Sequence, residues 1–462
     1  MKIKELIKRD AGFLYVVDNM EFMSSAGRRM MLNSDMMTDP KALTTEWDRL
    51  NRVIEASQND DNKKAYTDLR HCLMQLHDLK GTLASLAAHT TLDEVELFEI
   101  KNLAFLNSKA ATALTSMHLD DVLPLPCLSE VASLLDPDHT GIANFYIYDS
   151  YDVRLASLRR ELKVLQEHDG DALRISQLLS EQNDIQQQVC LRLSDLLSPH
   201  CQALTTALEQ MAYTDYLLAK SDLALRWSLT RPTLGDTVSH SQLFNPRLRD
   251  HNEQAGLRYQ PVSLTASHGV TLITGANMAG KTVLLKSVGT AQMMIQCGFY
   301  APSEASETML FDDIVSSIGD DQDEMNGLSS YASEIVNISD ILRRSHSERL
   351  LILIDEPART TNPVEGKALV QALLTLLQQT SSVSLVTTHY SGLGTACRRL
   401  RVRGFMEDMV DIPLNPRNIN RFIDYSLTED QSDNVPHEAL RIAEILGCDK
   451  DLTSLAKDFI AQ

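Results

Sequence analysis

The chain has 462 residues, of which 43% are apolar, 23% charged and 5% aromatic, a composition typical of a folded protein with several domains. This composition excludes the disordered, collagen-like and membrane classes. The net charge of −20 comes from 63 acidic and 43 basic residues. A field of this sign disfavours non-specific coating of nucleic acid, although a local basic groove stays open.

Three features indicate the compartment. The seven cysteines form no CxxC pair, and the N-terminal segment MKIKELIKRD has no apolar core of a signal peptide. The longest strongly aliphatic run, residues 350–354, is too short to span a bilayer. The sequence therefore predicts a cytoplasmic protein with reduced thiols and no membrane segment.

The first half of the chain is predicted to be helical. Residues 1–150 contain few glycines and carry apolar residues at helical spacing, as from Leu69 to Leu86, which indicates a helical core. Residues 151–231 continue this pattern but are interrupted by His-Asp-Gly-Asp at 168–171, a typical turn sequence. We expect two long antiparallel arms that meet near Gly170; a continuous bundle with a local kink is the alternative.

The second half, residues 232–462, is predicted to form an α/β domain. Aliphatic runs at 270–274, 350–354 and 383–387 lack apolar–polar alternation, which is typical of parallel strands buried on both faces. Helical segments separate these runs. The predicted fold is thus a mainly helical core with lever arms, followed by a P-loop NTPase domain of the ABC-like kind.

A phosphate-loop pattern, GxxxxGK[ST], follows the first of these strands and precedes a helix that continues from Val283. In this context the backbone amides and the helix N-terminus converge on the phosphates of a nucleotide. The lysine would reach the β and γ phosphates, and the hydroxyl would bind Mg²⁺. The residues of the loop are Gly275, Ala276, Asn277, Met278, Ala279, Gly280, Lys281 and Thr282.

Two acidic residues end the second strand, and a histidine follows the third. Asp355 is predicted to hold Mg²⁺, directly or through water, and Glu356 to orient the attacking water. His389 occupies a position suited to a γ-phosphate sensor, or to a structural hydrogen bond. These residues predict a Mg²⁺-dependent ATP hydrolase in which Lys281, Glu356 and His389 are catalytic.

These motifs resemble those of the MutS family, whose phosphate loop reads TGxNMxGKS/T, as residues 274–282 do here. Asp355-Glu356 with residues 359–366, and Thr388-His389-Tyr390, resemble the family's acid-pair loop and its THY motif. Residues 329–335, beginning with Ser329 and Ser330, are similar to the family's signature segment. The resemblance implies that this segment completes the ATP site of a partner subunit, so that ATP closes a homodimer and hydrolysis reopens it.

The sequence also departs from the family pattern. No residues precede Met1 that could form mismatch-reading domains, and the stretch around Gly170 is too short for a DNA-clamp domain. Glycines usual in the loop after the acid pair are replaced by Ala358 and Thr360. The resemblance therefore implies an ATPase that remodels or reactivates a protein partner, with a cobalamin-dependent aminomutase as the leading candidate. A DNA mismatch or branched-DNA binding ATPase is the alternative.

Some residues keep open assignments. Either Leu257 or Tyr259 is expected to stack on the adenine base, and their spacing from the phosphate loop in the sequence does not distinguish them. In a strand over 398–403, Arg399, Arg401 and Arg403 would share one face, which is either a solvated surface or a contact for phosphate or an acidic partner. Trp47 and Trp227 lie in helical apolar patterns and are predicted to be buried.

Overall fold

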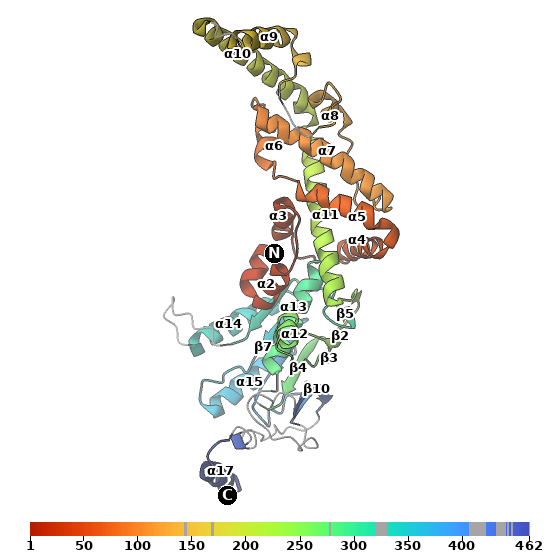
Figure 1. Cartoon of the computed structure of the whole chain (residues 1–462). Helices are drawn as coiled ribbons and strands as arrows, with labels where there is room; N and C mark the ends of the chain where they lie inside the picture. The colour runs from red at the N-terminus through yellow and green to blue at the C-terminus, as the bar shows by residue number, and fades with distance from the viewer. Residues whose placement is uncertain are drawn as a thin grey trace. The chain divides into compact units, whose positions relative to one another are not determined.

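In the computed structural model, two compact units make up the fold (Figure 1). The structure describes residues 1–142, 146–167, 171–276, 279–319, 330–405, 422–430, 440, 443–444 and 447–461. A helical unit contains residues 20–34 and 48–222, and an α/β unit contains residues 1–19, 35–47 and 223–462. The expected order, a helical half followed by an α/β half, is confirmed. The finer division at residues 150 and 231 stays a prediction.

The helical unit is built from amphipathic helices of varied length. Its long helices are α7 (Glu94–Ser116), α10 (Ala172–Leu197) and most of α11 (Cys201–Trp227), and α4 (Pro40–Gln58) contributes its C-terminal part. The shorter ones are α3 (Ser25–Asn33), α5 (Lys63–Met74), α6 (Lys80–Ala87), α8 (Ser129–Leu135) and α9 (Val153–Glu167).

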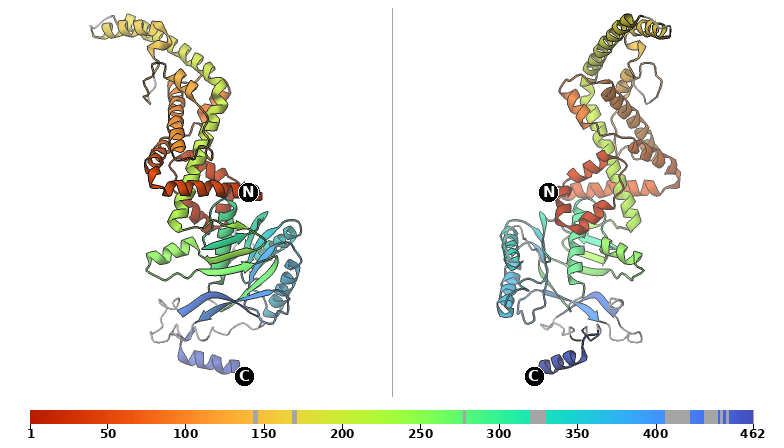
Figure 2. Two further views of the ribbon diagram at one scale, coloured as in Figure 1. Left: turned by 90° about the vertical axis from the view of Figure 1, so that its right-hand side faces the viewer. Right: turned by 60° about the vertical axis from the view of Figure 1, so that its left-hand side comes forward.

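Helices α9 and α10 form the predicted arms and lie side by side (Figures 1 and 2). An ion pair joins them, with Nη2 of Arg174 at 2.8 Å from Oε1 of Glu161. Four residues, 168–171, connect the two helices, and the turn at Gly170 itself lies outside the described residues.

Two buried polar networks fix the helical unit internally. The ammonium of Lys101 donates to Asp136 at 3.0 Å and to the hydroxyl of Tyr148 at 2.8 Å, and both its partners are buried. Asp215 on α11 accepts hydrogen bonds from the backbone N–H groups of Met23 and Ser24, and so holds in place Ser24, the residue that caps α3. Burial raises the pKa of Asp215, and these hydrogen bonds partly offset that rise.

The α/β unit contains a six-stranded sheet in the order β10-β9-β4-β8-β7-β6. Its strands are β4 (Gly269–Thr274), β6 (Asp313–Ser317), β7 (Leu350–Ile354), β8 (Val383–Thr387), β9 (Arg398–Phe405) and β10 (Ile423–Glu429). All neighbouring pairs are parallel except β9 with β10. Every residue of β4, β7 and β8 is buried, as their continuous apolar runs predict.

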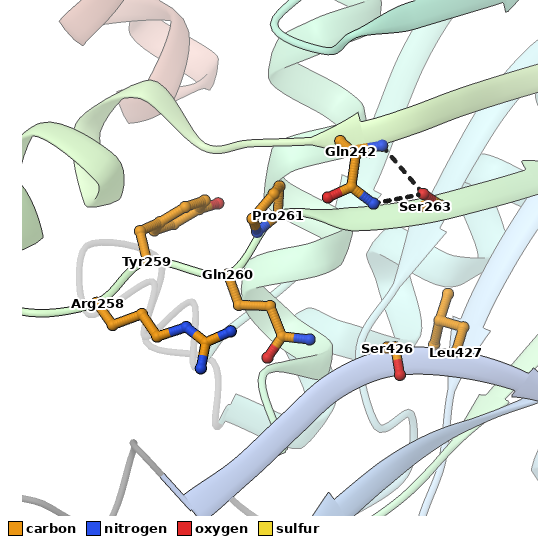
Figure 3. A pocket seen from close by; sticks show the side chains of 8 residues that line it. All are labelled: Gln242, Arg258, Tyr259, Gln260, Pro261, Ser263, Ser426 and Leu427. Atoms are coloured by element: carbon orange, nitrogen blue, oxygen red, sulfur yellow. Dashed lines mark hydrogen bonds between the residues drawn. The ribbon is translucent and has the colours of Figure 1, made fainter.

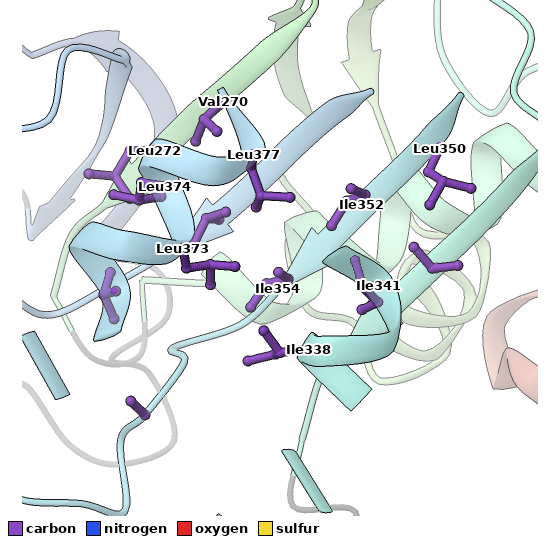
Figure 4. Close-up of a cluster of buried hydrophobic side chains, with 14 of the residues drawn as sticks. Val270, Leu272, Ile338, Ile341, Leu350, Ile352, Ile354, Leu373, Leu374 and Leu377 are labelled. Carbon is purple, nitrogen blue, oxygen red and sulfur yellow. The ribbon is translucent and has the colours of Figure 1, made fainter. Parts of the chain in front are cut away.

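Helices cover both faces of this sheet. They are α13 (Lys281–Gln296), α14 (Ser330–Ser345) and α15 (Pro363–Leu377). Figure 4 shows the apolar cluster that Ile338 and Ile341 of α14, and Leu373 and Leu374 of α15, form with strand residues such as Leu272 of β4 and Ile352 of β7. Because the strands are parallel, the carboxyl ends of β4, β7 and β8 lie at one edge, where ligand sites of such sheets form.

A second, four-stranded sheet of order β1-β5-β2-β3 belongs to the same unit. It consists of β1 (Thr233–Leu234), β2 (Val238–Leu243), β3 (Val262–Ala266) and β5 (Ala305–Thr308), and α12 (Pro246–Gln254) connects β2 to β3. Helix α17 (Lys450–Ala461) is the last described element.

The N-terminal segment completes the α/β unit through α1 (Ile3–Arg9) and α2 (Ala11–Asp18). Asp10, which caps α2, accepts a hydrogen bond from Thr290 of α13 at 3.0 Å. Arg9 pairs with Asp313 of β6 at 3.0 Å, and the backbone N–H of Met37 donates to the carbonyl of Gln296 at 2.7 Å. Trp47 and Trp227 are buried, which confirms the prediction made for them.

Candidate functional site

The phosphate loop connects β4 to α13, as predicted. Gly280 is the residue before the helix and has a left-handed φ of 77°, which glycine adopts without steric cost. The aromatic ring of Tyr425 packs against it, because a Cβ at this position would lie 3.0 Å from Cδ1 of that ring. Asn277 and Met278 lie outside the described residues. The loop thus delivers Lys281 and Thr282 at the first turn of α13.

Lys281 is buried and turns back over the loop. Its Nζ donates to the carbonyl oxygens of Gly275 at 2.8 Å and Ala276 at 3.1 Å, and lies 3.3 Å from Oε1 of Glu356. A buried ammonium needs such partners because an uncompensated charge is costly away from water. The loop lysine and the second acid of the pair therefore meet, although 75 positions, from 281 to 356, separate them in the chain.

Asp355 lies between two hydroxyl groups. Its Oδ2 accepts a hydrogen bond from Oγ1 of Thr282 at 2.6 Å, and its Oδ1 accepts one from Oγ1 of Thr387 at 2.6 Å. Thr387 ends the buried strand β8, and its oxygen also accepts the backbone N–H of Glu356 at 2.9 Å. A carboxylate with a threonine hydroxyl is a set of hard oxygen donors, which fits Mg²⁺.

The loop after the acid pair adopts an unusual backbone. Glu356 and Ala358 have φ values of 46° and 59°, in the left-handed region that residues with a Cβ rarely occupy. The N–H of Ala358 donates to Oε1 of Glu334 on α14, and its carbonyl accepts from the hydroxyl of Tyr390, both at 3.0 Å. The guanidinium of Arg359 lies 4.0 Å from Oε2 of Glu356.

His389 follows β8 at the same edge of the sheet, with an exposed side chain whose ring centre lies 4.3 Å from that of Tyr390. The preceding Thr388 is fully buried, and its N–H donates to the carbonyl of Ile273 on β4 at 3.2 Å. No hydrogen bond between His389 and the acid pair is found among the described residues, and its sensor role stays a prediction.

A cavity of about 250 Å³ adjoins the loop. Tyr259 lines it together with Gly280, Val283 and Tyr425, whereas Leu257 does not. Burial raises the pKa of Tyr259, and its hydroxyl accepts the backbone N–H of Asn245 at 2.7 Å. Of the two residues that spacing left open, Tyr259 is the one beside the loop.

A second cavity, of about 300 Å³, shares Arg258, Tyr259 and Gln260 with the first and is shown in Figure 3. Its remaining lining is mostly polar, and in Figure 3 the amide of Gln242 lies against the hydroxyl of Ser263, with an Nε2–Oγ distance of 3.2 Å. Gln260 links the cavity wall to β10, because its Nε2 donates to Asp424 at 2.8 Å.

The other residues predicted for the site are placed as follows. Ser329 and the side chain of Ser330 lie outside what the structure describes, although the backbone of Ser330 begins α14. In β9, Leu400 and Val402 are buried and the arginines alternate with them, which confirms the predicted strand pattern. Arg398 pairs with Glu429 at 2.6 Å and Arg403 with Asp424 at 3.6 Å, so acids on β10 offset part of this charge.

Comparison with known proteins agrees with this arrangement, since residues 271–461 match the family model of MutS domain V. This segment is similar to MutS domain V. An Endonuclease MutS2 of Pediococcus pentosaceus is 32% identical over 284 residues, which are 60% of this chain and 34% of that protein. An Endonuclease MutS2 of Gemmatimonas aurantiaca is 33% identical over 218 residues, 46% of this chain and 26% of that one.

A third relative, the Endonuclease MutS2 of Streptococcus uberis, is 33% identical over 227 residues, or 47% of this chain and 28% of its own. The chain thus matches about a third or less of the length of these relatives. No helix in the described part of the chain is long and apolar enough to cross a membrane. Within the same part, no group of three histidine, cysteine or acidic side chains forms a ready metal site.

Sequence reasoning missed several residues of the MutS domain that contact the predicted ones. Thr387 directly precedes the THY motif, so its place at the end of a buried strand could have indicated its role. Glu334 lies in the segment 329–335, whose resemblance to the signature segment did not indicate its contact with Ala358. Tyr425 gives no such signal, because it reaches the site from an element distant in sequence.

Proposed function

We propose that the MutS domain of this chain hydrolyses ATP with the help of Mg²⁺. The observation that carries this proposal is the convergence of Lys281, Thr282, Asp355 and Glu356 at the carboxyl edge of the parallel sheet. In this proposal Thr282 and Asp355 hold the metal ion, which would neutralise charge on the phosphates. Side chains of this protein would bind the phosphates and orient the attacking water.

Lys281 would bind the β and γ phosphates by exchanging its contacts with the loop carbonyls and Glu356 for contacts with phosphate oxygens. Glu356, released from the ammonium, would then accept a hydrogen bond from the attacking water and orient it. The backbone amides around Gly275 and Gly280 would bind the phosphates at the start of α13. Tyr259 is the proposed contact for the adenine base, in the cavity next to Gly280.

The test compares Lys281→Ala with Lys286→Ala, a matched control because Lys286 is an exposed lysine on the same helix. Losing one such electrostatic contact costs about 10²-fold or more in rate. We expect Lys281→Ala to abolish turnover and Lys286→Ala to keep it, measured as phosphate release with Mg²⁺. Unchanged hydrolysis by Lys281→Ala contradicts the proposal.

A nucleotide-dependent homodimer is proposed as the working form, because the segment that begins α14 is similar to one that completes a partner subunit's site. Glu356→Gln should retain ATP and stabilise the dimer, while Glu365→Gln, an exposed glutamate on α15, serves as control. Sedimentation velocity with and without ATP distinguishes the two states. A monomer under both conditions, at concentrations above the nucleotide affinity, excludes this form.

The proposed output is a conformational change in a protein partner, with a cobalamin-dependent aminomutase as the leading candidate. The supporting observations are the net charge of −20, the four-residue connection between α9 and α10, and the acids paired with Arg398 and Arg403. ATP-dependent recovery of an inactivated aminomutase would support it. Shortening residues 167–174 to a tight turn should abolish that recovery and leave basal ATP hydrolysis intact.

DNA is the second candidate, favoured by the similarity to proteins named Endonuclease MutS2. A protein that neutralises six or more phosphates loses about 10³-fold in affinity between 50 and 200 mM salt. We expect only weak binding to duplex and mismatched DNA, lost as salt rises, in fluorescence anisotropy. Tight binding near physiological salt, with stimulated ATP hydrolysis, would instead establish DNA as the ligand.

A further inference from the structure

Ala358 occupies a backbone conformation that its own chemistry disfavours. Its φ of 59° lies in the left-handed region, where the Cβ of an L-residue crowds the following carbonyl oxygen. That crowding lowers the population of the conformation by about 5- to 30-fold relative to the right-handed one. The residue is also buried, with 2% of its surface exposed. Something in the surrounding structure must therefore hold it.

Two hydrogen bonds from separate elements hold Ala358. Glu334 on α14 accepts its N–H at 3.0 Å, and the hydroxyl of Tyr390, after β8, donates to its carbonyl at 3.0 Å. Burial and the nearby Glu334 carboxylate raise the pKa of Tyr390, so the hydroxyl keeps the proton that it donates. Gly366 leaves room for this hydroxyl, because a Cβ there would lie 2.3 Å from it.

The same short segment carries Glu356. The backbone N–H of Glu356 is bound by Thr387 at 2.9 Å, and two residues later the chain is bound by Glu334 and Tyr390. The segment 356–358 is thus fixed at both ends. The direction in which the Glu356 carboxylate points depends on both attachments, since Glu356 itself has a left-handed φ of 46°.

We propose that Glu334 and Tyr390 form a clamp on Ala358 that positions Glu356, so that the placement of α14 controls hydrolysis. This inference rests on the proposed role of Glu356 in preparing water. Glu334 and Tyr390 are positioning residues in it, because they act through the backbone of Ala358. Because α14 begins at Ser330, a ligand or subunit that moves the start of this helix would alter the water-activating carboxylate.

The clamp has a definite kinetic signature. Without Glu334 or Tyr390, Ala358 relaxes toward a right-handed conformation, and the fraction of molecules with Glu356 in place falls. We expect kcat to fall about 5- to 30-fold, by the same factor as that population. The KM for ATP should change less than about twofold, because the proposed contacts of Lys281 with phosphate and of Thr282 with the metal ion do not involve Ala358.

The experiment measures ATP hydrolysis by Glu334→Ala and Tyr390→Phe in the full chain, with Asp340→Ala as a matched carboxylate control on α14. Asp340 is partly exposed on the same helix, where it pairs with Arg343. Each single variant should lower kcat, and their combination should cost little more, since either loss releases the same turn. Glu334→Gln keeps an acceptor oxygen and should retain most of the activity.

The decisive variant is Ala358→Gly, because glycine adopts positive φ as readily as negative φ. In this background the clamp is no longer needed to populate the turn. Adding Ala358→Gly to Glu334→Ala, or to Tyr390→Phe, should therefore restore kcat to within about threefold of the parent. Because glycine also relieves the strain of Ala358 in the folded state, a thermal melt of each variant separates recovery of kcat from a gain in fold stability.

Two results would overturn the clamp: unchanged kcat in both Glu334→Ala and Tyr390→Phe, or no recovery in the Ala358→Gly background. If Glu334→Ala fails to fold by circular dichroism, the Tyr390→Phe pair decides alone. Failure of the proposed function looks different, because Glu356→Gln would then hydrolyse ATP normally. A slow Glu356→Gln together with a fast Glu334→Ala rejects the clamp alone.

Discussion

Thr387 offers a direct test of how the acid pair is held. Its hydroxyl is completely buried, donates to Asp355 at 2.6 Å and accepts the N–H of Glu356 at 2.9 Å. Thr387→Val replaces the hydroxyl by a methyl group of similar size and keeps the branched Cβ that suits a strand. The substitution therefore removes two hydrogen bonds with little change in packing.

The magnitude follows from those two bonds. A hydrogen bond to a charged carboxylate contributes about 1.5–3 kcal/mol, and a neutral one about 0.5–1.5 kcal/mol. Part of this is regained if Asp355 and the freed N–H find other partners, so we take about 2–3 kcal/mol as the loss of transition-state stabilisation. At 1.36 kcal/mol per factor of ten, kcat should fall about 30- to 150-fold.

The assay is steady-state phosphate release with saturating ATP and Mg²⁺, with Thr387→Ser as the control that keeps the hydroxyl. We expect the serine variant to stay within about fivefold of the parent, since it loses one methyl group of packing. A thermal melt separates loss of activity from loss of fold. A Thr387→Val protein that is folded and hydrolyses ATP within twofold of the parent refutes the reasoning.

Three further predictions concern stability and packing. Lys101→Met should lower the free energy of unfolding of the helical unit by about 3–5 kcal/mol in calorimetry, because the Asp136 carboxylate stays buried without its ammonium partner. A loss under about 1 kcal/mol would contradict this prediction. Burial lowers the pKa of His240 from 6.5 to about 4. The contribution of this neutral histidine to the free energy of unfolding should therefore be complete above pH 6.5 and fall by up to about 3 kcal/mol toward pH 4. If a His240→Leu protein shows the same pH slope, a group other than His240 causes it. Gly366→Ala should displace the Tyr390 hydroxyl, because the new Cβ would lie 2.3 Å from it. This variant should therefore lower kcat as Tyr390→Phe does. Equal kinetics for Gly366→Ala and the parent would argue against this packing.

The sequence predicts those parts of the site that are formed by short motifs of neighbouring residues. The phosphate loop and the Asp355-Glu356 pair each follow a strand whose burial is evident from its aliphatic run. Because these strands run parallel in one sheet, both motifs lie at the same edge. Alternation in β9 was predictable for the same reason, because a period of two is a local property.

Other contacts depend on tertiary packing and leave no local pattern. The left-handed φ of Ala358 contradicts the preference of alanine, so only the bonds to Glu334 and Tyr390 explain it. Tyr425 reaches Gly280 across about 145 positions of sequence, on the one antiparallel strand that the described part of the larger sheet contains. The small sheet was not predicted because its strands are short and polar, as in Val238–Leu243.

The discontinuous make-up of the α/β unit bears on how this protein can be produced and cut. A fragment starting at residue 232 would contain every nucleotide motif and the whole matched segment, 271–461. It would lack residues 1–19 and 35–47, and with them the partners of Thr290, Gln296 and Asp313. The far end of α13 would then face water with buried side chains exposed. During synthesis, likewise, α1 and α2 can pack against α13 only after the ribosome has made α13.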